Sequence, residues 1–212
     1  MNDCEKKTLF SLYAQFEEVN NGMIGTIQYL EASKGIVKFV EQLGTLFKPV
    51  RSDINGNIEK LTSIYNSNPN KYKTLNSIVE VESKSIADGE FKIGTDALLW
   101  LTRALQYIHL FLTYFYEDYS KQVKNEDLSV HFKKAYEETL KMHHNWFVQQ
   151  IFYLCLNAAP DRTSLIKLIS IDDNEDAVDE AMVFKEIEKN NQLLNANITA
   201  VRSLFQSFSV CF

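Results

Sequence analysis

Apolar residues recur along most of the chain at the spacing expected for one face of an α-helix. Between residues 26 and 43, for example, Ile27, Leu30, Ile36 and Leu43 fall near this spacing. The two-residue alternation of a half-buried strand does not appear convincingly anywhere in the sequence. The pattern therefore predicts an all-α protein.

Turn and capping residues divide this pattern into about eight predicted helices. Pro49 suits the first turn of a helix, and Pro160 ends one. The predicted helices cover about residues 9–20, 26–43, 49–65, 72–84, 93–119, 130–158, 163–169 and 177–208. Since neither a repeat nor a low-complexity linker separates them, residues 1–212 are predicted to form one domain.

One apolar stretch, residues 97–116, approaches the length of roughly 20 residues that spans a bilayer. It also carries Arg103 and His109, and a charge in mid-bilayer is costly. We therefore expect a buried helix of a helical domain rather than a membrane span.

Composition narrows the class of protein further. With 45% apolar and 24% charged residues the chain resembles an ordinary soluble globule, and only 7 glycines and 3 prolines interrupt it. A net charge of −6 without a basic stripe argues against a nucleic-acid partner. Cys4, Cys155 and Cys211 are too few and too far apart for a disulfide framework. Since residues 1–5 begin no signal peptide, we expect a cytoplasmic protein.

A polar face lies on the predicted helix after Pro49. Asp53, Asn57 and Lys60 stand at positions i, i+4 and i+7. Together they offer a carboxylate acceptor, an amide and a cationic donor, a mixture that suits the hydroxyl groups of a sugar. The alternative is a solvated helix face with an Asp–Lys attraction.

Two further predicted helices carry aromatic or histidine side chains on apolar faces. Trp100, Arg103, Tyr107 and Phe111 share a stripe that either packs in the core or presents an indole to a pyranose ring. His144 is either a core histidine or a hydrogen-bond donor to a buried amide carbonyl, and neighbouring His143 is expected to point elsewhere. The face of His144 on its predicted helix also carries Leu140, Phe147, Val148, Ile151 and Cys155.

Signatures of catalysis are missing from the sequence. It contains neither a Gly-x-Ser-x-Gly elbow nor a glycine-rich phosphate loop, and no Glu-x-x-His pair suggests a di-iron bundle. We therefore predict no catalytic residue, no metal and no cofactor.

Four short motifs in order along the chain resemble the glycolipid transfer protein family. They are Asp53-x-x-x-Asn57-x-x-Lys60, Leu99-Trp100-Leu101-x-Arg103, His144-x-Trp146 and Ala158-Ala159-Pro160. The resemblance implies a two-layer all-helical sandwich that transfers glycosphingolipids between membranes without enzymatic chemistry. It also implies a monomer that meets membranes peripherally and reversibly.

The resemblance also implies roles for individual residues. Asp53, Asn57, Lys60, Trp100 and His144 would bind the sugar and the ceramide amide. The hydrophobic pocket for the ceramide chains would be lined by Phe47, Val50, Tyr107, Phe111, Leu140, Phe152, Cys155 and Leu156. Trp146, Phe147 and Tyr136 would contact the membrane. The chain departs from the family pattern at Asp96, Asn157 and Asp161.

Other functions stay open on the sequence alone. A branch of the same family binds ceramide-1-phosphate, but it has cations where this chain has Asn57 and Trp100. A lipid sensor or adaptor would use the same fold. A helical protein-interaction module would use Trp146 and Phe147 as a partner surface.

Overall fold

The computed structural model describes residues 8–85, 92–171 and 179–212, and these residues are mainly helical. The α-helices are α1 Leu9–Leu12, α2 Thr26–Gln42, α3 Lys48–Ser67, α4 Leu75–Ser85, α5 Ile93–Ser120, α6 Ser129–Glu138, α7 Trp146–Leu156, α8 Arg162–Ser170 and α9 Glu180–Ser207. Two short 3-10 helices, η1 Thr45–Phe47 and η3 Lys141–His143, precede α3 and α7. Pairing of extended backbone in the described ranges is limited to two isolated bridges, so the all-α prediction is confirmed.

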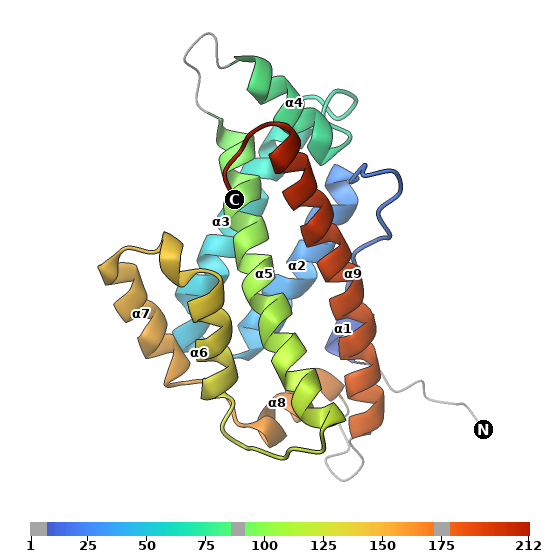
Figure 1. Ribbon diagram of the computed structural model, residues 1–212. Coiled ribbons are helices and arrows are strands. Elements are labelled where there is room, and N and C mark those ends of the chain that lie inside the picture. The colour runs from blue at the N-terminus through green and yellow to red at the C-terminus, as the bar shows by residue number, and fades with distance from the viewer. Residues whose placement is uncertain (1–7, 86–91, 172–178) are drawn as a thin grey trace, which may run out of the picture.

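The helices form two layers around α5. In Figure 1, α5, α6 and α9 lie in front of α2 and α3, while α4 and α8 lie at opposite ends of the molecule. The most extensive helix contacts join α5 to α9, α2 to α3 and α3 to α5. The observed fold is therefore the expected two-layer helical sandwich.

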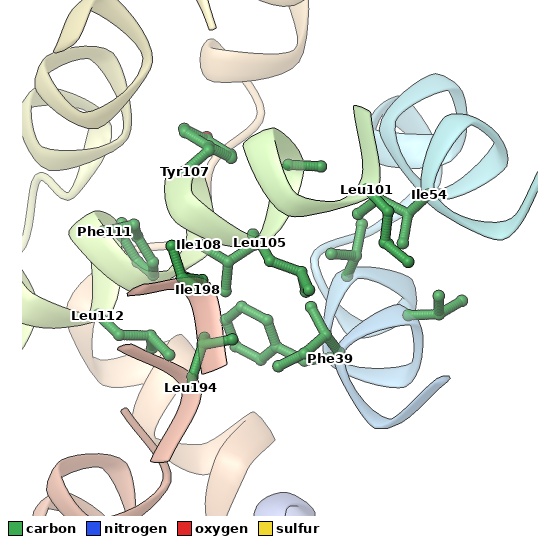
Figure 2. Packing of buried hydrophobic residues seen from close by; sticks show 14 of the residues in the cluster. Phe39, Ile54, Leu101, Leu105, Tyr107, Ile108, Phe111, Leu112, Leu194 and Ile198 are labelled. Atoms are coloured by element: carbon green, nitrogen blue, oxygen red, sulfur yellow. The ribbon is translucent and has the colours of Figure 1, made fainter. Parts of the chain in front are cut away.

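Helix α5 lies at the centre of the apolar core. Its buried side chains include Leu105, Ile108 and Phe111, and Figure 2 shows Leu105 and Ile108 beside Phe39 of α2 and Ile198 of α9. The described helices include none that is both long and apolar enough to cross a membrane. The prediction of a buried helix over residues 97–116 is thus confirmed.

The first predicted helix is much shorter than expected. It ends at Leu12 because Tyr13 adopts an extended backbone conformation. The segment that follows places Phe16 in the core, edge-on to Tyr29 with ring centroids 5.4 Å apart. A short helix is only marginally stable by itself, so this tertiary contact decides the local structure.

The single long helix predicted over residues 130–158 is also wrong. The chain leaves the helix at Thr139, whose hydroxyl donates to the Ala135 carbonyl at 2.6 Å, and His144 is extended. Asn145 then caps α7 by accepting the Val148 N–H at 3.0 Å. Gln149 donates to the carbonyl oxygen of His144 at 2.9 Å, which satisfies an acceptor freed by the break.

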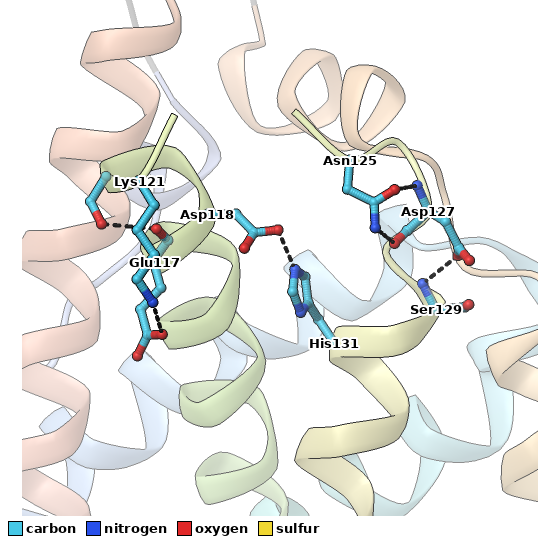
Figure 3. Close-up of polar contacts among 8 residues, drawn as sticks. Glu117, Asp118, Lys121, Asn125, Asp127, Ser129 and His131 are labelled. Carbon is cyan, nitrogen blue, oxygen red and sulfur yellow. Dashed lines mark hydrogen bonds and ion pairs between the residues drawn. The ribbon is translucent and has the colours of Figure 1, made fainter. Parts of the chain in front are cut away.

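Polar contacts fix α6 against the end of α5. Figure 3 shows His131 of α6 facing Asp118 of α5, and their Nε2 and Oδ2 atoms are 2.7 Å apart. In the connecting loop, Asp127 accepts the Ser129 N–H at 2.9 Å. These contacts set the position of α6, which carries a residue of the candidate site.

Glu82 of α4 holds the start of α5. Its carboxylate accepts the backbone N–H groups of Gly94 and Thr95, each at 2.7 Å, and the Thr95 hydroxyl at 2.7 Å. We expect Glu82→Ala to lower the free energy of unfolding by about 1 to 2 kcal/mol, because it removes this cap. Denaturant titration measures the change. Glu80→Ala, which removes an exposed carboxylate of the same helix paired with Lys84, is the control.

Candidate lipid-binding site

The polar face predicted on α3 exists, and its members are linked to one another. Asn57 is buried, and its side-chain amide donates to the backbone carbonyl of Asp53 at 3.0 Å. Lys60 Nζ lies 3.5 Å from the Asn57 side-chain oxygen. The position of the Asn57 amide is thereby fixed between the more exposed Asp53 and Lys60.

The Asp53 carboxylate stands at the mouth of a pocket. Desolvation by the surrounding protein raises its pKa above the ordinary value, and the positive charge of Lys60 offsets part of this rise. More than a third of the residue is still accessible to solvent, so water screens this effect. Such an acceptor is suited to a ligand that brings its own donors.

Trp100 of α5 is surrounded by cationic and imidazole groups. The Arg103 guanidinium lies 4.9 Å from the centre of the indole, a cation–π distance. The ring of His144 stacks with the indole at 6.1 Å and an interplanar angle of 17°, and His143 meets it edge-on at 6.3 Å. The expectation that His143 points away from His144 is therefore wrong, since both rings face Trp100.

His144 is held by Tyr136 of α6. The Tyr136 hydroxyl and His144 Nδ1 are 3.1 Å apart, and Tyr136 stacks on Phe152 at 3.9 Å. Desolvation, followed by the nearby His143, lowers the pKa of His144, so its imidazole is neutral at pH 7. If Tyr136 donates to Nδ1, Nε2 of the neutral ring carries the proton and is free to donate.

This arrangement corrects the role predicted for Tyr136. Its side chain is 0% exposed, so it does not contact a membrane in this structure. The packing of its ring on Phe152 and the bond from its hydroxyl to His144 explain the burial. Tyr136 instead belongs to the wall that orients His144.

A pocket with a cavity volume of about 140 Å³ lies between α3, α5 and α7. Ten residues line it, and they are mainly apolar: Pro49, Val50, Asp53, Ala104, Leu140, His144, Val148, Ile151, Phe152 and Cys155. This volume is smaller than the usual range of about 300 to 1,000 Å³ for ligand sites, so a large ligand would have to widen the pocket. Asp53 and His144 are the only charged or titratable side chains in this lining besides the Cys155 thiol.

The predicted pocket residues divide into two groups. Val50, Leu140, Phe152 and Cys155 line the pocket. Phe47, Tyr107, Phe111 and Leu156 are buried but are not part of its lining. Phe111, for example, stacks on Phe132 with ring centroids 3.7 Å apart, deep in the core. Hydrophobic pattern alone does not distinguish these two kinds of buried position.

Four lining residues were not predicted as part of the pocket: Pro49, Ala104, Val148 and Ile151. A signal for two of them was present, because Val148 and Ile151 share the apolar face of residues 146–156 with Cys155. Pro49 and Ala104 gave no comparable signal, since a helix-starting proline and a small core residue are common anywhere.

An apolar surface lies next to the pocket, in η3 and at the start of α7. Met142, Trp146 and Phe147 are 75%, 72% and 65% exposed. Isolated apolar side chains are ordinary at a protein surface, but three large ones so close in sequence are a candidate contact site. We call these three residues the α7 apolar surface.

The three departures from the family pattern all lie at helix ends. Asp161 caps α8 by accepting the Ser164 N–H at 2.7 Å, and this hydrogen bond lowers the pKa of its carboxyl. Asn157 stands at the C-terminal cap of α7. Asp96 lies in the first turn of α5, where a negative charge interacts favourably with the helix dipole.

Within the described ranges, no group of three or more His, Cys, Asp or Glu side chains is arranged to hold a metal ion. The carboxylate of Asp53 and the imidazole of His144 line an apolar pocket, and the amide of Asn57 and the cation of Lys60 lie beside Asp53 on α3. This combination is suited to an amphipathic ligand with a polar, hydrogen-bonding head.

Comparison with known proteins agrees with this description. The sequence profile named glycolipid transfer protein (GLTP) matches residues 24–170. A glycolipid transfer protein of Xenopus tropicalis is 36% identical over 188 residues, which are 86% of this chain and 85% of that protein.

Solved structures are similar over nearly the whole chain. One, described as showing how FAPP2 selects simple glycosphingolipids using the GLTP fold, has a TM-score of 0.82 at 25% identity and covers 99% of this chain and 96% of that chain. The apo form of mouse ceramide-1-phosphate transfer protein has a TM-score of 0.81 at 20% identity, covering 96% and 98%. The latter likeness concerns the fold alone, so the overall fold does not decide between a sugar and a phosphate.

Proposed function

This chain belongs to the glycolipid transfer protein family, and on that premise we propose that it carries glycosphingolipids of the glucosylceramide or galactosylceramide type between membranes. The sugar binds Asp53, Asn57, Lys60 and Trp100 at the surface, and the ceramide chains enter the pocket. The observation that carries the proposal is the position of Asp53 and His144 at an otherwise apolar pocket. A lipid with a polar head and hydrocarbon chains needs hydrogen-bonding side chains and an apolar pocket side by side.

The residues around the head favour a sugar over a phosphate. A phosphate is best held by several Arg or Lys donors. Here Asn57 presents an amide, and Arg103 is buried with its guanidinium against the rings of Trp100 and Phe212. Sugar hydroxyls both donate and accept, so they match a carboxylate and an amide better than a phosphate does.

Carriage needs no covalent step. Each CH₂ group moved from water to an apolar environment gains about 0.8 kcal/mol, so a free ceramide leaves a bilayer very slowly. A pocket that solvates the chains lowers this barrier without changing either end state. The relatives are named as transfer proteins, and we propose that this chain likewise makes and breaks no bond.

The pocket accepts long chains if α7 moves. α7 packs mainly on α6 and η1, and residues 139–145, which include the short helix η3, join it to α6. Displacement of α7 would widen the pocket between Val148 and Ile151 on one side and Pro49 and Val50 on the other.

We also propose that residues 1–212 act as one domain and as a monomer in the cytoplasm, with reversible, peripheral membrane contact. The first and last described helices share one core, because α1 contacts α8 and α9 while α9 packs along α5. The described thiols, Cys155 and Cys211, are both free, which is consistent with a reducing compartment.

Transfer of labelled glucosylceramide between vesicles tests the proposed function, with ceramide-1-phosphate measured beside it. We expect catalytic amounts of protein to move the glycolipid and not the phosphate lipid. Movement of the phosphate lipid alone would overturn the headgroup assignment. Tight binding without transfer would favour a lipid sensor over a carrier.

Tyr136 provides a prediction that separates its two possible roles. We expect Tyr136→Phe to weaken glucosylceramide binding about fivefold to tenfold. The substitution removes the hydrogen bond between the Tyr136 hydroxyl and His144, so the tautomer and the ring orientation of His144 are no longer fixed. Its attachment to vesicles without ligand should not change, because the residue is buried. Equilibrium binding and vesicle sedimentation measure the two effects. Weakened vesicle attachment with normal lipid affinity would restore the membrane role.

A further inference from the structure

The hydroxyl of Tyr107 is buried without a partner next to the pocket. Tyr107 lies on α5 one turn after Ala104, which lines the pocket, and it is 1% exposed. Among the residues that the structure describes, none forms a hydrogen bond with this hydroxyl. A buried polar group without a hydrogen-bond partner destabilises a fold, so most buried polar groups in proteins are paired. The exception calls for an explanation.

The two other fully buried tyrosines are paired. Tyr29 meets the Thr102 hydroxyl at 3.2 Å, and Tyr136 meets His144 Nδ1 at 3.1 Å. A tyrosine can therefore be fully buried in this fold and still have a hydrogen-bond partner for its hydroxyl. Tyr107 differs from both because its hydroxyl has no hydrogen-bond partner among the described residues.

Several contacts place Tyr107 on the pocket side of α5. Its ring meets Phe152 edge-on at 5.2 Å, and Phe152 lines the pocket. In Figure 2, Tyr107 projects away from the side of α5 that carries Leu105 and Ile108. Cys155, which also lines the pocket, lies close enough to contribute to the pKa of Tyr107.

The contacts of Phe152 show how far Tyr107 lies from His144. The ring of Phe152 contacts His144 at 6.2 Å and Tyr107 at 5.2 Å. Tyr107 thus lies one aromatic ring beyond the imidazole proposed to bind the ceramide amide. Burial raises the pKa of its phenol well above the ordinary value, so the group stays a neutral O–H donor at physiological pH.

Phe152 of α7 separates Tyr107 from the pocket, so displacement of α7 by a bound lipid would uncover the hydroxyl of Tyr107. We propose that Tyr107 then hydrogen-bonds a hydroxyl group on a hydrocarbon chain of the bound lipid, so that the pocket prefers hydroxylated ceramides. The inference rests on the proposed function and deepens it. The chain hydroxyl must lie near the amide, either on carbon 2 of the acyl chain or on carbon 4 of the sphingoid base. A hydroxyl in a wholly apolar pocket would lose its hydrogen bonds to water, whereas here it gains a partner.

Two pairs of glucosylceramides test this inference. The members of one pair differ only by the acyl 2-hydroxyl, and those of the other only by the sphingoid 4-hydroxyl. We expect wild-type protein to prefer the hydroxylated member of one pair by about tenfold in competition for binding. In Tyr107→Phe, which removes one oxygen and keeps the ring, this ratio should fall to about one.

Tyr29→Phe is the matched control. It removes a paired hydroxyl of a buried tyrosine outside the site, so it should lower the Tm and leave the selectivity ratio unchanged. Tyr107→Phe should keep or raise the Tm, because the hydroxyl it removes is unpaired. Equal binding of both members of both pairs by wild type, or an unchanged ratio in Tyr107→Phe, would overturn the inference. If wild type binds no glucosylceramide, the proposed function falls and the inference falls with it.

Discussion

Replacing Asp53 by valine is expected to reduce glucosylceramide transfer by about a hundredfold or more while the protein stays folded. The carboxylate is proposed to accept hydrogen bonds from the sugar and from the ceramide amide. Hydrogen bonds to a charged group contribute about 1.5 to 3 kcal/mol each, and about 1.4 kcal/mol corresponds to a factor of ten. The initial rate of vesicle transfer measures the loss.

Removing the charge of Asp53 should lower the rate of transfer but should not lower the stability of the fold. The folded-state pKa of Asp53 is raised above the ordinary value of 3.8, so the folded protein holds this proton more tightly than the unfolded chain does. The ionised carboxylate therefore opposes folding at neutral pH, and this effect disappears as the pH falls to 3.8 and below. Asp53→Asn, which cannot ionise, should be at least as stable as wild type at pH 7, with the difference vanishing in acid.

A substitution at another carboxylate of α3 distinguishes an effect on the proposed site from a general effect of losing a surface charge. Glu59→Gln removes an exposed carboxylate of α3 that accepts from Asn55, and it should leave transfer unchanged. Normal transfer by a folded Asp53→Val protein would overturn the assignment of the headgroup site. A large loss of stability in Asp53→Asn would instead indicate a structural carboxylate.

The double substitution Trp146→Ala and Phe147→Ala is expected to slow vesicle transfer about tenfold or more. Both side chains are largely exposed on the α7 apolar surface, where they can enter the headgroup region of a bilayer. Their removal forfeits part of the roughly 1.5 to 3 kcal/mol that burial of each large apolar side chain contributes. Affinity for a glucosylceramide presented in detergent micelles should not change.

Exposed apolar residues elsewhere provide the control for this prediction. Met23→Ala with Ile93→Ala removes comparable exposed apolar area away from α7 and should leave transfer intact. If Trp146 and Phe147 contribute only to lipid binding, micelle affinity and vesicle transfer will fall together. If they form a protein-interaction surface, neither measurement will change.

Sequence reasoning predicted the parts of the fold that local pattern determines. α5 is a single helix because, after Gly94 in its first turn, its apolar face continues to Ser120 without glycine or proline. The break between α6 and α7 escaped prediction because it contains neither glycine nor proline. The break depends on the Thr139 hydroxyl, the extended His144 and the cap at Asn145. Threonine, histidine and asparagine also occur within or beside ordinary helices, so these residue types do not reveal the break.

The candidate site was predicted less completely than the fold. The α3 face was recognisable because Asp53, Asn57 and Lys60 share a helical spacing, and the structure joins them directly. The burial of Tyr136 was not recognisable, since its ring packs on Phe152 across the helix break. Which buried residues face a pocket and which face the core depends on how three helices meet, and no single helix encodes that.

The central claim is that the polar residues at the pocket select a sphingolipid by its sugar. Native mass spectrometry tests it most directly, on protein incubated with vesicles containing equal amounts of glucosylceramide, ceramide-1-phosphate and ceramide. We predict one glucosylceramide bound per protein chain, with the other two lipids nearly absent from the complex. Preferential binding of ceramide-1-phosphate or of bare ceramide would contradict the account.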